Sequence, residues 1–281
     1  MTKPQVLDRG QWDLITPEVA GWHYLSFQVV KLTGGQTFSL PADGNERALV
    51  NLSGDFDVTV HDRCYRFGGR DNVFAGLGHC LYVPRDMSAE VRGSAGAEFA
   101  VTTCPATMAL EPVLVTPEVA SPVARGAGNA SRQVSALIPP DFHADRLHII
   151  EVWTPGGNWS SYPPHKHEYE AEDETELEET YYYRLRDPDK GWALQRVYSP
   201  ERDFDLTRPV RDGDICLIPW GYHTTVAAHD QDLYYLNALA GPAPERSLRA
   251  SEDPALMEAR LKWSALTVDD RLPLVPRRPR V

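Results

Sequence analysis

Prolines and glycines interrupt this sequence at short intervals and leave little room for long helices. Its 281 residues include 23 prolines and 20 glycines, spread along the whole length. Between them lie short alternating or β-branched runs, for example residues 56–60 and 148–153. Runs of this length and spacing predict an all-β sandwich or barrel. Only residues 254–266 show helical periodicity, so we expect a short C-terminal helix there, capped by Ser251.

A segment rich in proline and small residues, 105–133, divides the sequence into two halves. In each half a turn containing glycine and aspartate leads to an apolar strand that ends in proline, at Pro84 and at Pro219. This similarity indicates two distantly related β domains. We therefore expect domains at residues 1–125 and 126–250, followed by a helical tail at 251–281. A histidine follows Pro219 but not Pro84, so only the second domain is expected to bind a metal.

The net charge and the lack of long apolar segments argue against two classes of binding partner, nucleic acids and membranes. The formal net charge of -12 argues against a nucleic-acid partner, which needs clustered lysine and arginine. The N-terminus lacks an apolar signal sequence, and no segment approaches the roughly 20 apolar residues that span a bilayer. We therefore expect a cytoplasmic protein that has neither nucleic acid nor a membrane as its partner.

Two histidines one residue apart, His165 and His167, form half of a potential metal site. Residues i and i+2 of a β-strand point to the same face, so both imidazoles can reach one ion while Lys166 faces away. His223, which follows Gly221 in an expected tight turn, is the third candidate ligand. Protein sites for zinc, iron or manganese take about three or four ligands, so a carboxylate should complete the set.

The missing carboxylate is expected from the acidic stretch before Tyr181. Glu179 shares one strand face with Tyr181, whereas Glu178 lies on the opposite, more polar face. An inward face with a single carboxylate at its start suits a ligand position, so we choose Glu179. Glu178 and Glu176 stay open as alternatives, and the acidic residues of 168–176 are expected to form a mobile, solvated loop.

Two more residues are candidates for contacts with a substrate. Tyr183 lies two positions beyond Tyr181 on the expected ligand face, where its hydroxyl could donate a hydrogen bond or relay a proton. Gln195 and Arg196 alternate in direction on the next expected strand, so only one of them can face the cavity. An inward Arg196 could bind a substrate carboxylate through two hydrogen bonds, and a surface ion pair is the alternative for it.

The H-x-H pair, a later glutamate and P-x-G-x-H together resemble the two sequence boxes of the cupin superfamily. The long acidic insertion and the tyrosine-rich strand after it resemble the bicupin family of uronate isomerases. The matching segments are 157–167, 177–184, 195–198, 212–223 and 232–242. The resemblance implies two tandem cupin barrels, each a double-stranded β-helix or jelly roll. It also implies one divalent metal ion, zinc, manganese or iron, held by His165, His167, Glu179 and His223.

The same resemblance implies an enzyme that acts on a small uronic acid. The implied reaction is the aldose–ketose isomerisation of 5-deoxy-D-glucuronate to 5-dehydro-2-deoxy-D-gluconate in myo-inositol catabolism. Glu179, Tyr183 or a metal-bound water could carry the proton, and Arg196 could hold the carboxylate. A metal-dependent dioxygenase and a non-catalytic sugar-binding bicupin are the alternatives, since the same ligands suit those roles. The edges of two barrels would also allow a homo-oligomer.

Overall fold

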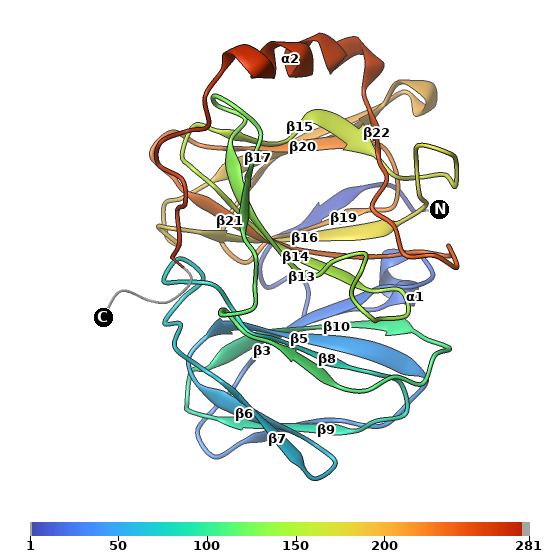
Figure 1. Ribbon diagram of the computed structural model, residues 1–281, viewed down its shortest axis with the longest axis vertical. Coiled ribbons are helices and arrows are strands. Elements are labelled where there is room, and N and C mark those ends of the chain that lie inside the picture. The colour runs from blue at the N-terminus through green and yellow to red at the C-terminus, as the bar shows by residue number, and fades with distance from the viewer. Residues whose placement is uncertain (1, 277–281) are drawn as a thin grey trace.

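The computed structural model describes residues 2–276, and β-strands dominate it (Figure 1). The strands form four antiparallel sheets stacked along the long axis of the molecule, and two sheets make up each of two barrels. Within this range the only α-helical segments are α1 (Pro17–Ala20) and α2 (Met257–Leu261). The prediction of an all-β fold with a short C-terminal helix is confirmed.

The first barrel joins a six-stranded sheet to a four-stranded one. The larger sheet has the order β11 (Val113–Val115), β8 (Cys80–Val83), β5 (Asn45–Ser53), β10 (Glu98–Pro105), β3 (Ser26–Lys31), β2 (Leu14–Ile15). The smaller sheet has the order β4 (Thr37–Leu40), β9 (Ala89–Gly93), β6 (Phe56–Val60), β7 (Arg63–Phe67).

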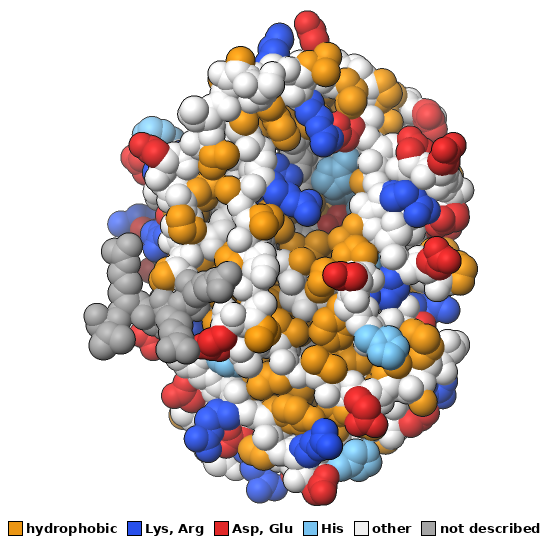
Figure 2. Space-filling view, viewed as in Figure 1, with side chains coloured by type: hydrophobic (Ala, Val, Ile, Leu, Met, Phe, Trp, Pro, Cys, Tyr) orange, Lys and Arg blue, Asp and Glu red, His pale blue; other side chains and the backbone are white. Residues whose placement is uncertain are grey.

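The second barrel joins a seven-stranded sheet to a five-stranded one. The larger sheet has the order β1 (Gln5–Leu7), β19 (Ile215–Ile218), β16 (Glu178–Leu185), β21 (Leu233–Ala240), β14 (His148–Thr154), β13 (Arg132–Ile138), β12 (Val123–Arg125). The smaller sheet has the order β18 (Phe204–Val210), β17 (Ala193–Ser199), β20 (Tyr222–Ala227), β15 (Trp159–Lys166), β22 (Ser251–Glu252). Figure 2 shows a hollow over this barrel, in the upper half of the view, where a histidine and basic side chains gather.

The two barrels repeat the same strand order. In the large sheets, β8-β5-β10-β3 corresponds to β19-β16-β21-β14, and in the small sheets β4-β9-β6-β7 corresponds to β15-β20-β17-β18. The strands that lead to Pro84 and Pro219 are therefore equivalent, as the sequence similarity around these two prolines predicts. The internal repeat lets a residue of one barrel be compared with its counterpart in the other.

Strand exchange links the two barrels. β1, from the N-terminal end of the chain, pairs with β19 at the edge of the second barrel. The connection between the two halves supplies β11, which pairs with β8 in the first barrel, and β12, which pairs with β13 in the second. β1 and β12 lie before residue 126 in the sequence but pair with strands of the second barrel. The domain boundaries at residues 125 and 250 therefore stay predictions.

Three hydrophobic cores separate the four sheets. One core lies inside each barrel, and the third lies between the two large sheets. β16 contributes to two of these cores, because the side chains on both of its faces are largely buried. Tyr181 and Tyr183 point into the second barrel, whereas Tyr182 points into the core between the barrels and contacts Phe27.

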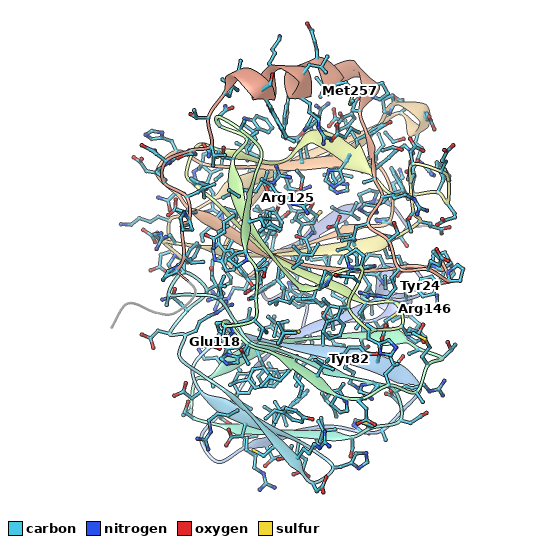
Figure 3. All side chains as sticks on the ribbon, viewed as in Figure 1. Tyr24, Tyr82, Glu118, Arg125, Arg146 and Met257 are labelled. Carbon is cyan, nitrogen blue, oxygen red and sulfur yellow. The ribbon has the colours of Figure 1, made fainter. Side chains whose placement is uncertain are left out.

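Two buried glutamates connect the barrels in a reciprocal way. Glu46, on β5, accepts the backbone N–H groups of residues 145–147, which lead into β14. Glu178, on β16, accepts those of residues 23–25, which lead into β3. Nearby, the Arg146 guanidinium lies 5.4 Å from the ring centre of Tyr24 (Figure 3). Each carboxylate thus accepts hydrogen bonds from three consecutive backbone N–H groups of the other barrel.

The C-terminal segment folds over the small sheet of the second barrel. After β22 it forms three short helical pieces in place of one helix, namely η2 (Pro254–Leu256), α2 and η3 (Lys262–Ala265). Ser251 was wrong as the helix cap, because it pairs with Lys166 in β22; Asp253 caps instead by accepting the N–H of Ala255 at 2.9 Å. Residues 277–281 of the expected tail lie outside the described residues. Of the helices within residues 2–276, none has the length and apolar character needed to cross a membrane.

Candidate metal centre

A bulge in β15 sets the position of the paired histidines. β15 pairs with β20 at Ser160 and again at His165, and between these points β15 advances five residues while β20 advances two. The extra residues include two prolines, which have no N–H to donate to a sheet. As a result His165 lies directly opposite His223, and His167 lies just beyond the end of β15.

The other two candidate ligands come from neighbouring strands. Glu179, on β16, lines a pocket in the second barrel, while Glu178 points the opposite way to the interface between the barrels. His223, on β20, follows Gly221, whose φ is +97°. A Cβ on Gly221 would lie 3.0 Å from the carbonyl oxygen of Tyr198, so glycine suits both the backbone conformation and the space.

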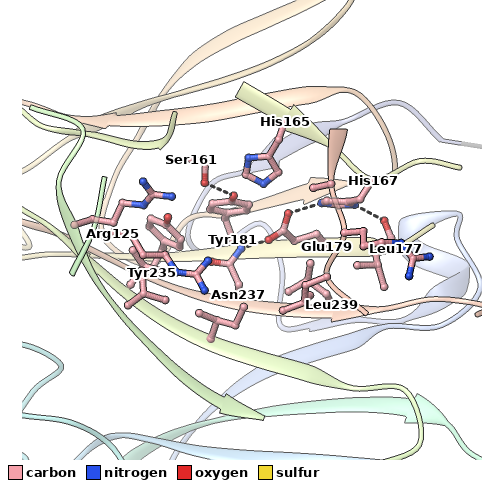
Figure 4. Close-up of a pocket in the computed structure, with 17 residues that line it drawn as sticks. Arg125, Ser161, His165, His167, Leu177, Glu179, Tyr181, Tyr235, Asn237 and Leu239 are labelled. Atoms are coloured by element: carbon pink, nitrogen blue, oxygen red, sulfur yellow. Dashed lines mark hydrogen bonds and ion pairs between the residues drawn. The ribbon is translucent and has the colours of Figure 1, made fainter. Parts of the chain in front are cut away.

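The imidazoles of His167 and His223 converge on one oxygen of Glu179. Figure 4 shows the contact between His167 and Glu179. Glu179 Oε2 lies 2.9 Å from His167 Nε2 and 3.1 Å from His223 Nε2. The other nitrogen of each ring faces a backbone carbonyl oxygen, that of Leu177 at 2.9 Å for His167 and that of Gly221 at 3.0 Å for His223. The second carboxylate oxygen, Oε1, accepts a hydrogen bond from the Asn237 amide. All three ligand side chains are buried.

The hydrogen bonds around these rings fit a bound cation. Since each Nδ1–H donates to a carbonyl, a neutral ring presents its Nε2 lone pair to Glu179 Oε2, which is also an acceptor. Acceptors that face one another in a buried site need a proton or a metal between them. Burial lowers the pKa of His167, but its contacts with Glu179 outweigh that effect and raise the pKa above its usual value. Carbonyls that orient imidazoles in this way are typical of metal sites.

His165 lies beside this cluster. It lines the same pocket, and its ring centre is 4.6 Å from that of His223. Burial and the proximity of His223 lower its pKa well below the usual value, so the ring is neutral and able to bind a metal. The structure thus brings His167, Glu179 and His223 within ligand distance of one another, with His165 adjacent. The role of His165 as a fourth ligand stays a prediction.

Comparison with known proteins assigns this chain to a family. The model of the KduI/IolB family matches residues 2–259. The chain belongs to the KduI/IolB family. A relative from Geobacillus thermodenitrificans, named 5-deoxy-glucuronate isomerase, is 40% identical over 251 residues, which cover 88% of this chain and 91% of that protein. A relative of the same name from Bacillus subtilis is 34% identical over 236 residues, covering 83% of this chain and 86% of that protein.

Solved structures agree with the family match. An IolB-like protein from Salmonella typhimurium superposes with a TM-score of 0.86 at 34% identity, covering 91% of this chain and 98% of that one. The oxalate decarboxylase of Bacillus subtilis, which has Mn(II) centres, superposes with a TM-score of 0.62 at 13% identity, covering 92% and 82%. This second similarity concerns the fold alone. The predicted membership of the bicupin uronate isomerases is confirmed, and so is the predicted cupin fold.

The pocket of this KduI/IolB family member is lined by Tyr181 rather than by the expected Tyr183. The Tyr181 hydroxyl lies 2.9 Å from Ser161 Oγ, and its ring is 5.7 Å from that of His223. Tyr183 lies one pleat further along β16, inside the barrel core, and donates its hydroxyl to Gln195 Oε1 at 2.7 Å. Alternation along the strand identifies the face of both tyrosines but does not identify which of them reaches the pocket.

The arginines of the pocket also differ from the expectation. Arg196 lies outside the pocket and pairs with Asp205 at 2.6 Å, as in the surface alternative. Arg125, Arg132 and Arg249 line the pocket instead. Arg125 and Arg132 lie in residues 105–133, which the sequence pattern predicts to connect two domains. The prolines and glycines of this segment weaken the strand signals of β12 and of the start of β13. The brief alternating run directly after Arg132, residues 133–136, was the available signal.

The expected solvated acidic loop is partly buried. Glu168 and Glu174 are each only 3% exposed. Glu174 accepts the N–H of Glu168 and pairs with Lys166 at 2.8 Å, while Glu168 accepts the N–H of Gly221 at 2.9 Å. The expectation was wrong for these two glutamates, because each satisfies otherwise unpaired donors. Through them the loop is attached to the turn that precedes His223.

The first barrel carries an arginine at the position of Glu179. Glu179 pairs with the residue before Pro219, and Arg47 pairs with the residue before Pro84. Arg47 is 1% exposed and donates to two backbone carbonyl oxygens. In the first barrel a buried guanidinium therefore takes the place of an acidic ligand, and this positive charge would repel a metal cation. It supports the prediction that the first barrel binds no metal, which stays a prediction.

Proposed function

We propose that this KduI/IolB family member is a metal-dependent 5-deoxy-D-glucuronate isomerase. The observation that carries the proposal is the convergence of His167 and His223 on Glu179 in a pocket that also holds arginines. Relatives named 5-deoxy-glucuronate isomerase support it, with identities up to 40% over most of both chains. The proposed partner is a small uronic acid, and the proposed location is the cytoplasm.

The proposed ligands of a divalent ion are His165, His167, Glu179 and His223. Three imidazoles and one carboxylate suit zinc, manganese and iron alike. A metal bound there would supply a Lewis acid that stabilises the negative charge developing on the sugar oxygens during isomerisation. Asn237, which donates to Glu179 Oε1, would hold the carboxylate in its orientation.

The chain's own residues would bind the sugar and move a proton between its first two carbons. Glu179 is the proposed proton carrier: burial favours its neutral form, but its contacts with His167 and His223 hold its pKa below the usual range and keep it ionised. Burial raises the pKa of Tyr181 well above the usual value, and the charge of Glu179 raises it further. Tyr181 would therefore act as a hydrogen-bond donor to a sugar oxygen. Tyr183 could carry a proton only after leaving Gln195.

An assay under controlled oxygen tests this function. Purified protein is given 5-deoxy-D-glucuronate, and the product is followed by NMR together with dissolved oxygen, before and after treatment with a chelator. We expect conversion to the ketose without oxygen uptake, and loss of conversion after chelation. Oxygen consumption coupled to turnover would contradict the isomerase and favour a dioxygenase. Tight binding without turnover by the metal-loaded protein would favour a sugar-binding bicupin.

A further inference from the structure

Two arginines face each other across a pair of strands at one side of the pocket. Arg125 on β12 and Arg132 on β13 are direct partners in the antiparallel register. Both line the pocket. Like charges directly opposite one another on a sheet are destabilising unless a group of opposite charge lies between them.

These two guanidinium groups have no acidic partner within the described part of the chain, residues 2–276. Neither forms an ion pair there, and the hydrogen bond of Arg132 goes to the backbone carbonyl oxygen of Ala130 at 3.4 Å. Arg249, the third arginine of the pocket, differs because it pairs with Glu170 at 2.9 Å. Arg125 and Arg132 are therefore the cationic groups of the pocket that are free to take an anion.

The position of this pair relative to the candidate metal centre sets the orientation of a ligand. In Figure 4, Arg125 and Tyr235 lie on one side of the pocket, and His167 and Glu179 lie on the other, with Tyr181 between them. The two arginines attract a carboxylate, because no ion pair within residues 2–276 neutralises their charges. A six-carbon sugar acid would then place its carboxylate at the arginines and its carbonyl end at the metal ligands.

We propose that Arg125 and Arg132 form the site that binds the substrate's carboxylate and that selects sugar acids over neutral sugars. This inference rests on the proposed isomerase function for the identity of the substrate. The site itself is defined by the paired arginines and by their position opposite Glu179. Arg132 is the principal anchor, because it is the less exposed of the two. A planar guanidinium can bind a carboxylate through two parallel hydrogen bonds.

The test compares Arg132→Gln and Arg132→Lys with a control, Arg66→Gln, in the metal-loaded enzyme. We expect Arg132→Gln to lower kcat/KM by about 10- to 100-fold, mainly through KM, since it removes hydrogen bonds to a charged group. Arg132→Lys should recover part of the loss, because it restores the charge without the planar fork. Arg66→Gln, at an arginine of the first barrel whose side chain is 86% exposed, is the control and should match the wild type. Metal content is measured for every variant, so that damage to the metal centre is recognised.

A binding experiment separates this inference from the proposed function. Calorimetry compares D-gluconate, a sugar acid, with D-glucitol, its neutral counterpart, on the wild type, on Arg132→Gln and on Arg196→Gln. We expect gluconate to bind the wild type at least about tenfold more tightly than glucitol, and Arg132→Gln to lose this preference. An unchanged preference in Arg132→Gln, or its loss in Arg196→Gln alone, would overturn the inference. If the wild type prefers gluconate but does not isomerise 5-deoxy-D-glucuronate, the proposed function fails while the anion site stands.

Discussion

Replacing Glu179 with glutamine is expected to lower kcat by roughly 1,000-fold or more and to weaken metal binding. The amide has no negative charge, so it can neither balance a divalent cation nor accept a proton as the carboxylate does. In the structure, His167 Nε2 and His223 Nε2 both lie within 3.1 Å of Glu179 Oε2. Turnover followed by NMR and metal content by atomic absorption measure the two losses in the same preparation.

Glu178→Gln is the matched control for this prediction, because the two glutamates are adjacent and point to opposite faces of β16. Glu178 accepts three backbone N–H groups at the interface between the barrels and has no contact with the candidate ligands in the described structure. The control variant should therefore lose stability but keep its metal and its kcat at a temperature where it is folded. Wild-type kcat and metal content in Glu179→Gln would contradict the role assigned to this residue.

Replacing Glu151 with glutamine is expected to destabilise the protein by about 3–5 kcal/mol. Glu151 and Arg70 form an ion pair of 2.7 Å in which both side chains are 0% exposed. Glu151 lies on β14, in the second barrel, and Arg70 follows β7 of the first, so the pair crosses the core between the barrels. The variant leaves a buried guanidinium without its counter-charge, and the Tyr234 hydroxyl also loses its charged acceptor. Urea unfolding followed by tryptophan fluorescence measures the change.

An exposed ion pair gives the comparison for Glu151. Asp57 and Arg66 lie 3.4 Å apart on the first barrel, with side-chain exposures of 43% and 86%. Asp57→Asn should change the free energy of unfolding by less than about 1 kcal/mol, because solvent screens both charges. If the two variants lowered stability equally, the buried pair would not have the energetic importance that its position implies.

Alternation along a strand predicted a large part of the site. The two faces of β16 differ in sequence, and this difference points to Glu179 rather than to its neighbour as the inward carboxylate. The H-x-H pair and the later P-x-G-x-H likewise predict three of the four candidate ligands, which lie on β15, just beyond its end, and on β20. These inferences need only local geometry and one resemblance, because strand periodicity and turn residues are properties of short segments.

Long-range contacts account for what the sequence did not predict. Alternation does not tell how deep a residue lies in a barrel, so Tyr181 and Tyr183 could not be distinguished. Arg132 lies in a stretch rich in small residues and proline, where strand signals are weak, and its partner strand β12 has only three residues. Glu168 became buried because Gly221, more than fifty residues away in sequence, needs an acceptor. Pairings of this kind depend on the closed barrel and not on the segment.

Metal reconstitution tests the central claim most directly. Chelated protein is titrated with one divalent metal under anoxic conditions, and initial rates with 5-deoxy-D-glucuronate are measured at each addition. We expect activity to rise linearly and to level off at about one equivalent per chain, since Arg47 replaces the acidic ligand in the first barrel. His223→Ala, prepared in the same way, should not recover. Full activity in the metal-free protein, or equal recovery of His223→Ala, would contradict an isomerase that works at this centre.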